Sequence, residues 1–156
     1  MSSPDNQAPA SWQLVEFLAA RVRLITKASG YRTDIGNGLV VVDDSDVPAE
    51  FEGPSTVIEV DRISATSSGR SQASSDVGVV IEFSVPRGGD QENPRQLVHC
   101  ARADLRRALV FDLRDLPKGV TSFEVTEANL ATVGDDAGHS SVVAQITARA
   151  GLTEVF

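Results

Sequence analysis

Histidine and cysteine are the side chains of this sequence best suited to metal binding or nucleophilic catalysis. The two histidines, His99 and His139, lie far apart and lack a spacing such as His-Glu-x-x-His, which sets two metal ligands on one helix face. His99 is followed by Cys100, but a nucleophile–base pair also needs a third group that orients the base. We therefore predict no metal site and no cofactor, and interpret the pair as a half-exposed histidine beside a small buried hydrophobe.

Two polar segments contain residue types found in active sites. Residues 135–141 collect an acid, an imidazole and hydroxyls, yet a hairpin turn also requires Asp, Gly and Ser, and a triad is defined by spatial roles. Residues 87–90, Arg-Gly-Gly-Asp, lack the Gly-x-x-x-x-Gly-Lys-Ser/Thr pattern of a phosphate-binding loop. We interpret the first as a hairpin turn and the second as a loop, and predict no catalytic residue and no enzymatic activity.

Arg102, Arg106 and Arg107 form a small basic group that could contact phosphate. Because Asp104 and Asp112 lie close in sequence, we expect an ordinary solvated face. The formal net charge of −8 also disfavours nucleic-acid recognition, which is driven by clustered Lys and Arg that release counterions.

The composition is that of one globular domain. A chain of 156 residues can bury roughly 70% of the surface that it exposes when unfolded. With one Trp, one Tyr and six Phe, the core must come mainly from Val, Leu, Ile and Ala, which favours a fold with a sheet. The single Cys100 cannot form an internal disulfide, so we expect assembly in a reducing cytoplasm. Neither an apolar leader nor a run of roughly 20 apolar residues occurs, so we expect neither secretion nor membrane insertion.

Two helices are expected after a flexible lead-in over 1–10. The first spans 11–28, with Ser11 as its N-cap and Gly30 at its end. The second begins with Asn93 as N-cap and Pro94 in the first helical position. Their apolar faces are Val15, Leu18, Val22 and Ile25 in the first helix, and Leu97, Val98, Ala101, Leu105, Ala108 and Leu109 in the second.

Runs of β-branched residues predict five strands, over 39–43, 56–63, 77–85, 120–133 and 141–149. The Ser-rich segment 64–75 cannot pack a core, so we expect a long hairpin loop, either a solvated linker or a loop that orders against a partner. The resulting order is α-β-β-β-α-β-β in a single domain over 11–156. This grouping predicts an α+β fold, a mixed or antiparallel sheet with both helices packed on one face.

The first predicted helix and the turn after it resemble the N-terminal part of phage tail terminator and minor tail proteins of the lambda type. There a helix commonly ends in a Gly-Tyr-x-Thr-Asp-x-Gly phrase before the first strand. The order of the remaining elements is also similar, including a helix that carries Asp104-Leu-Arg-Arg-Ala-Leu109. This sequence departs from the family in lacking a Pro-x-Val directly before the second strand and in its Ser-rich hairpin. The residues that match the phrase are Gly30, Tyr31, Thr33, Asp34 and Gly36.

The resemblance implies a structural virion protein without catalytic activity. Such a protein assembles as a ring, usually of six subunits, on the last ring of the tail tube, halts tube growth and offers a surface to the head or neck. The implied partners are further copies of the chain, the tail-tube protein and a head-completion protein. DNA would pass through without specific binding, and an acidic wall would help it to slide.

Two segments are candidate contact sites in such a ring. The centre of the Ser-rich loop is a candidate partner or channel loop, comprising Ser67, Ser68, Gly69, Arg70 and Ser71. The apolar end of the sequence is a candidate subunit interface, through Leu152, Val155 and Phe156. Two other readings remain: another virion component, such as a head-closure or tube protein, and an enzyme or small-ligand-binding domain, which a deep pocket with convergent polar groups would favour.

Overall fold

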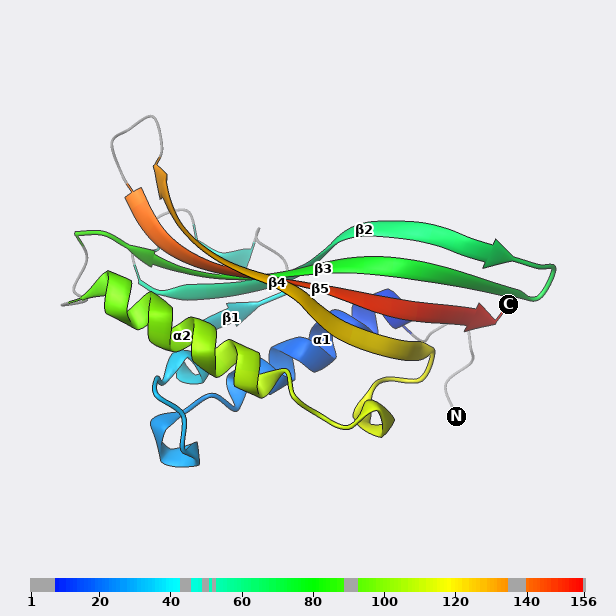
Figure 1. Ribbon diagram of the computed structural model, residues 1–156, viewed down its shortest axis with the longest axis horizontal. Helices are drawn as coiled ribbons and strands as arrows, with labels where there is room; N and C mark the ends of the chain where they lie inside the picture. Colours follow the sequence, from blue (N-terminus) through cyan, green and yellow to red (C-terminus); the bar gives the residue numbers. More distant parts are fainter. Residues whose placement is uncertain are drawn as a thin grey trace.

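The described part of the chain folds into two helices and a five-stranded sheet (Figure 1). The computed structural model describes residues 8–42, 46–48, 51, 53–88, 93–134 and 140–155. The predicted α+β class and the order α-β-β-β-α-β-β are confirmed. The elements are α1 (Ala10–Arg23), β1 (Leu39–Val41), β2 (Ser55–Ser68), β3 (Gln72–Pro86), α2 (Pro94–Ala108), β4 (Val120–Gly134) and β5 (Ser140–Val155), with short 3-10 turns at Lys27–Ser29, Ile35–Asn37 and Leu113–Asp115.

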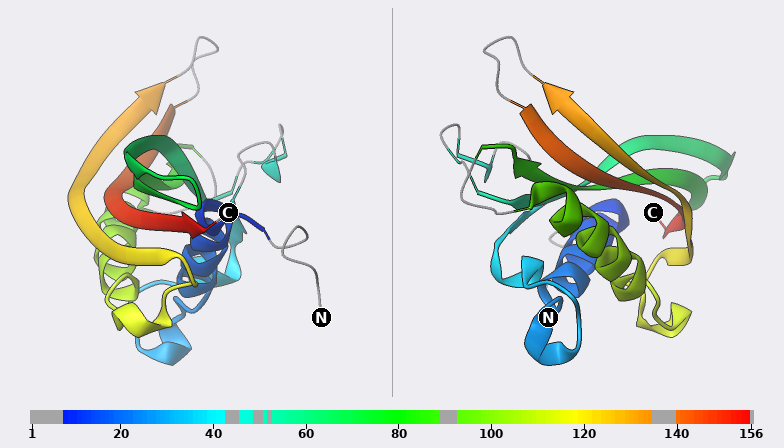
Figure 2. Two further views of the ribbon diagram at one scale, coloured as in Figure 1. Left: turned by 90° about the vertical axis from the view of Figure 1, so that its right-hand side faces the viewer. Right: turned by 60° about the vertical axis from the view of Figure 1, so that its left-hand side comes forward.

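The sheet has the strand order β1-β2-β3-β5-β4, so β1 and β4 lie at its two sides. β1 runs parallel to β2, and all other neighbours are antiparallel. Both helices pack on one face, as predicted (Figures 1 and 2). No described helix lies on the other face. Along most of β3 and β5, alternate residues are buried toward α1 and α2, and those between are polar or partly exposed, apart from the buried Val143.

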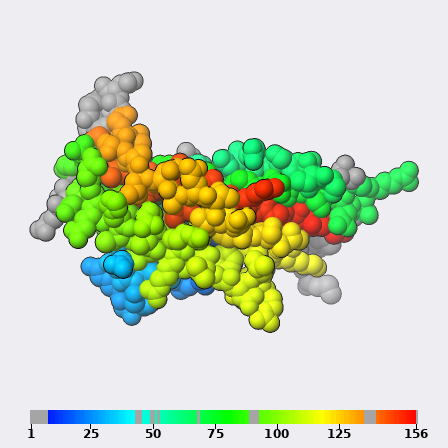
Figure 3. All heavy atoms as spheres, viewed as in Figure 1, coloured from blue at the N-terminus to red at the C-terminus, as the bar shows by residue number. Residues whose placement is uncertain are grey.

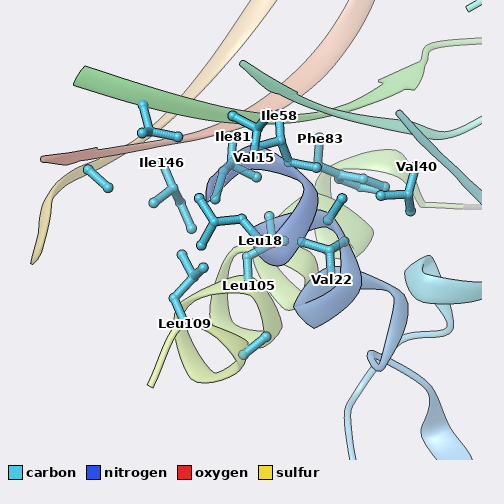
Figure 4. Packing of buried hydrophobic residues seen from close by; sticks show 14 of the residues in the cluster. Val15, Leu18, Val22, Val40, Ile58, Ile81, Phe83, Leu105, Leu109 and Ile146 are labelled. Atoms are coloured by element: carbon cyan, nitrogen blue, oxygen red, sulfur yellow. The ribbon is translucent and has the colours of Figure 1, made fainter. Parts of the chain in front are cut away.

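The core fills the layer between the helices and the sheet (Figure 4). The apolar stripe predicted for the first helix is buried, and each of its side chains is at most 2% exposed. Its members are Val15, Leu18 and Val22 of α1 and Ile25 just after it. Full burial of an aliphatic side chain of this size stabilises a fold by roughly 1.5–3 kcal/mol. The predicted face of α2 is also buried, apart from Leu97, which packs at its margin; the other members are Val98, Ala101, Leu105, Ala108 and Leu109.

The bounds of α1 differ from the prediction. The helix begins at Ala10 with Pro9 in the N-cap position and no side-chain cap, so Ser11 is not its N-cap. It ends before residue 28 because Thr26 is extended and its hydroxyl accepts a hydrogen bond from the Ser29 N–H, which competes with the helix. Gly30 closes the resulting 3-10 turn with a left-handed φ of 92°.

The start of α2 is as predicted. The side chain of Asn93 accepts a hydrogen bond from the backbone N–H of Gln96 at 3.2 Å, and Pro94 occupies the first helical position. This cap fixes the residue at which α2 begins.

The Ser-rich segment 64–75 is a paired β-hairpin, so the prediction of a long loop is wrong for all but residues 69–71. β2 and β3 pair as far as Ser68 and Ala73, and β5 continues alongside β3 up to the Gln72–Val155 pair. Backbone hydrogen bonds need no apolar side chains, and the third strand supplies pairing that sequence spacing did not reveal. The segment is thus part of a three-stranded arm.

The last strand also runs further than predicted, to Val155 rather than 149. Leu152 is 2% exposed and belongs to the core, where it pairs with Ser75 and Val120. Leu152 is therefore unavailable as a subunit interface, because its own chain already covers it. Val155 is exposed, and Phe156 lies outside the described residues.

Candidate functional site

The residues with catalytic or metal-binding chemistry do not converge in the described part of the chain. His99 is exposed and Cys100 half-buried on α2, and no group of three or more described His, Cys, Asp or Glu side chains is placed to hold a metal ion. Arg87 and Gly88 form a turn after β3. The remaining candidates, at 89–90 and 135–139, lie outside the described residues.

The turn that carries the resemblance is a structural joint between α1 and α2. Asp104 of α2 is 2% exposed, and its carboxylate accepts hydrogen bonds from the backbone N–H groups of Arg32 (3.1 Å) and Thr33 (2.8 Å) and from the Thr33 hydroxyl (2.7 Å). A buried carboxylate and a buried hydroxyl are stable only when they are hydrogen-bonded in this way. The expectation that Asp104 belongs to a solvated face is wrong, since it points into the turn.

The other residues of the turn also have structural partners. The guanidinium of Arg107 lies 4.4 Å from the centre of the Tyr31 ring and donates to the Gly30 carbonyl at 2.8 Å. Asp34 accepts a hydrogen bond from the backbone N–H of Lys27. Gly36 lies so close to α1 that a Cβ would sit 2.5 Å from the Arg23 carbonyl oxygen. The basic group is thereby divided: both Arg106 and Arg107 are exposed, but only Arg107 contacts this turn.

A cavity of about 670 Å³ opens beside this turn, between β1, β2 and the start of α2. Its volume lies within the range of small-molecule sites. Thr56 lines it, and the hydroxyl oxygen of Thr56 is buried without a hydrogen-bond partner among the described residues. Lys27 and Arg32 supply positive charge, Asn93 and Gln96 supply amides, and Phe83 supplies an apolar wall. The cavity could hold an apolar group that carries an acceptor.

Among the described residues, the outer edge of β2 is unpaired over most of its length. β1 pairs only with Ser55–Val57, and residues 61–67 are exposed. A cleft of about 310 Å³ lies beside this edge, bounded by Trp12 of α1, Val42 and Val60. Trp12 is 41% exposed. Unpaired backbone N–H and C=O groups beside an apolar cleft offer a place where another strand can add.

β4 forms the opposite edge, since β5 is the only described strand that pairs with it. Leu130 and Val133 are exposed on it, and the turn Leu113–Asp115 lies beside it with Leu113 exposed. Phe111 joins that turn to β4 by packing against Phe123, with ring centres 5.3 Å apart. Exposed apolar side chains therefore accompany both free edges.

The helix-free face of the sheet is acidic. Cross-strand pairing places residues such as Glu82, Gln145 and Asn129 in one row on this face. Arg149 is neutralised by an ion pair with Asp76. Among the charged residues of this face the acids are in excess; they are Glu59, Asp76, Glu82, Glu124 and Glu127 against Arg62 and Arg149.

The arm ends in the predicted partner loop. Ser67 and Ser68 end β2, and Gly69, Arg70 and Ser71 form the turn, closed by a hydrogen bond from the Gly69 N–H to the Gln72 carbonyl at 2.7 Å. Figure 3 shows this tip projecting beyond the rest of the molecule. The loop residues are brought together at one exposed point, far from the turn at 30–36 and from the helices.

A local ion pair orders the turn that leads to β4. Arg114 donates to the carboxylate of Asp112 at 2.8 Å, and these hydrogen bonds lower the pKa of Asp112 below its usual value. Both side chains are solvent-exposed, so the pair shapes the turn and adds little stability. Asp112 is thus a partner of Arg114, not of the basic group on α2.

The described helices include none that is both long and apolar enough to cross a membrane. The free edges, the acidic face, the arm and the cavity beside the turn are the most distinctive surface features of the described residues. No protein-family model matches the sequence, and no curated protein matches it either.

Proposed function

We propose that this chain is a non-catalytic structural subunit that assembles with identical copies into a ring. The observation that carries the proposal is the pair of free edges. β4 forms one edge of the described sheet, and on the opposite side β2 is unpaired beyond Val57, where β1 ends. Three successive antiparallel pairings make β4 antiparallel to β2. A second copy placed beside the first in the same orientation therefore sets its β4 antiparallel to β2, and repetition by rotation closes a ring.

The resemblance gives the ring its role, that of a tail terminator. The Gly30–Gly36 phrase and the Asp104–Leu109 stretch, which carry the resemblance, contact each other through Thr33 and Asp104 and so form one structural unit. In this role a ring, usually of six copies, caps the phage tail tube, stops its polymerisation and joins it to the head or neck. Its partners are the tail-tube protein and a head-completion protein, and its place is the virion.

We assign the helix-free face to the channel wall. Its excess of acids over arginines disfavours retention of phosphate, so DNA can pass without specific binding. Arg70, at the exposed tip of the arm, is the basic residue most able to interrupt such a wall.

Measurement of the mass in solution, together with negative-stain images, tests the proposal. We expect a cyclic oligomer with an open centre that binds the end of a tail tube of the same virus and prevents its elongation. A protein that stays monomeric both alone and on tubes would overturn the proposed function, as would a closed particle without a channel.

A second candidate function, binding of a small molecule, is favoured by the cavity at Thr56. A fragment screen read by thermal shift would support it if stabilising compounds lose their effect in Leu97→Trp, which adds bulk to the cavity lining. Ala103→Trp, a change on α2 that does not line the cavity, is the matched control.

A further inference from the structure

We propose that neighbouring copies join through β2 of one and β4 of the next, in the register that sets Arg62 opposite the partner's Glu127. This inference rests on the proposed self-assembly and identifies its contact surface. It names a second copy of the chain as the occupant of the β2 edge. The argument uses the direction of the strands, the charges on the helix-free face and the apolar side chains on the helix-covered face.

The charges of the two edges lie in rows that can be followed across the sheet. Arg62 pairs with Gly78, Gly78 with Arg149, and Arg149 with Glu124, so one row runs from a cation at the β2 edge to an anion at the β4 edge. The adjacent row on the same face ends in Glu59 on β2 and in Glu127 on β4. Which row of one copy meets which row of the next decides the charge pairing.

Three registers can be compared by these pairs. With rows aligned, Arg62 meets the partner's Glu124 but Glu59 meets the partner's Glu127, so one attraction is offset by one repulsion. A shift of one row in one direction sets Glu59 against the partner's Glu124 and leaves Arg62 facing a serine. The opposite shift sets Arg62 against the partner's Glu127 and Glu59 against the partner's Asn129, with no like-charged pair. Direct cross-strand neighbours of like charge destabilise a sheet, so this last register is favoured.

A stagger of this kind is also what ring closure requires. Strands that close around an axis are tilted relative to that axis. The tilt requires a fixed total shift of the hydrogen-bond register on going once around the ring. An aligned, unshifted junction would continue the sheet without that tilt.

The same register matches apolar residues on the helix-covered face. Ile58 comes opposite the partner's Leu130, and Val60 opposite the partner's Ala128. Leu130 is 39% exposed in the single chain, and the cleft of Trp12 and Val60 lies beside this part of β2. A leucine from the next copy would thus cover the exposed indole face, while its backbone would satisfy the free edge.

A two-fold junction between two β2 edges is the main competing arrangement. It would also pair Arg62 with an acid, the partner's Glu59. However, it would leave Leu130 on the β4 edge exposed. The junction between β2 and β4 covers Leu130 together with the part of the β2 edge that β1 leaves unpaired, which begins at Ile58, and we therefore favour it.

Charge reversal tests the junction and its register. Arg62→Glu is expected to raise the dissociation constant of the oligomer by roughly tenfold or more, because it sets like charges opposite each other. Adding Glu127→Arg should restore assembly, whereas adding Glu124→Arg or Glu59→Arg should not. All four side chains lie on the sheet surface, and circular dichroism melting of each variant verifies folding.

Cysteine pairing provides a second measurement that does not depend on affinity. In a Cys100→Ser background, Glu59→Cys with Asn129→Cys should form disulfides between copies on mild oxidation, and Glu59→Cys with Glu127→Cys should not. Within one chain β3 and β5 separate these positions, so a disulfide reports on two copies.

Rescue by Glu124→Arg would replace the proposed register by the aligned one, and rescue by Glu59→Arg would replace the junction by the two-fold one. An oligomer that Arg62→Glu leaves unchanged would overturn the junction while the proposed ring stands. If the wild-type chain remains monomeric both alone and on tail tubes, and the variant with Glu59→Cys and Asn129→Cys forms no disulfide between copies, both proposals are overturned.

Discussion

The turn at 30–36 and the Ser-rich arm use the same residue types in opposite ways. In the turn, Thr33 is 3% exposed and its N–H and hydroxyl are both bound by the buried Asp104. In the arm, residues 64–67 are exposed and the strands are held by backbone pairing. Polar residues between apolar runs can therefore build either an internal joint or a protruding surface, and what decides is whether a distant helix supplies the partner.

This comparison assigns stability to the turn and contact surface to the arm. The joint connects α2 to the segment between α1 and β1 through the hydrogen bonds of Asp104, so the residues that make these bonds should matter to folding. The arm adds area at the margin of the sheet, and its loss should alter assembly more than folding.

The largest effect is expected for Asp104→Ala. The change leaves two backbone N–H groups and the Thr33 hydroxyl without their acceptor in a buried place, which should lower the free energy of unfolding by about 3 kcal/mol. Urea denaturation followed by circular dichroism measures it. Arg106→Ala, an exposed change on the same helix, is the control and should stay within about 0.5 kcal/mol. A loss for Asp104→Ala no larger than that of the control would show that the turn does not depend on this carboxylate.

A smaller loss is expected for Gly36→Ala. The added Cβ would lie 2.5 Å from the carbonyl oxygen of Arg23 and 2.6 Å from that of Ile25, so backbone of α1 must move, at a cost of about 2 kcal/mol. Gly38→Ala is the matched control, because its nearest contact is 3.4 Å and its φ of −88° suits any residue. Equal melting temperatures for the two variants would show that the turn yields freely.

The sequence was sufficient to predict what periodicity and local chemistry determine. The buried stripe from Val15 to Ile25 and the cap at Asn93 are such features, since each depends on residues a few positions apart. The partner of Thr33 was not predictable, because Asp104 lies 71 residues away and sits among arginines that suggest a solvated face.

The edge strands of the sheet were likewise not predictable, because no local sequence pattern determines the order of strands in a sheet. One signal was available. Gly78 and Gly151 lie inside the central strands β3 and β5, and each faces a bulged residue of the neighbouring strand, Asp61 of β2 or Thr121 of β4. Glycine in a strand interior often marks such a bulge, and bulges are frequent at sheet edges. The arm was not predicted because its serines cannot pack a core. Its strands are held instead by backbone pairing, including the pairing of β3 with β5.

The smallest effect on folding is expected from shortening the arm. Ala65 and Ser75 are cross-strand partners, so residues 66–74 can be replaced by Asn-Gly, which forms a two-residue hairpin turn with the twist that the strands require. The pairs lost with β5 are those of Gln72, Ala73 and Ser74, at the C-terminal end of β5, while Leu152 keeps its partner Ser75. We expect the free energy of unfolding to fall by no more than about 1 kcal/mol, since the removed side chains bury little apolar surface.

The matched control replaces only Gly69–Ser71 by Asn-Gly and keeps the arm at nearly full length. If the short-arm variant no longer folds cooperatively, the arm belongs to the core and the contrast with the turn fails. If it folds but no longer ends tube growth, whereas the control does, the arm is a contact surface of the assembled ring.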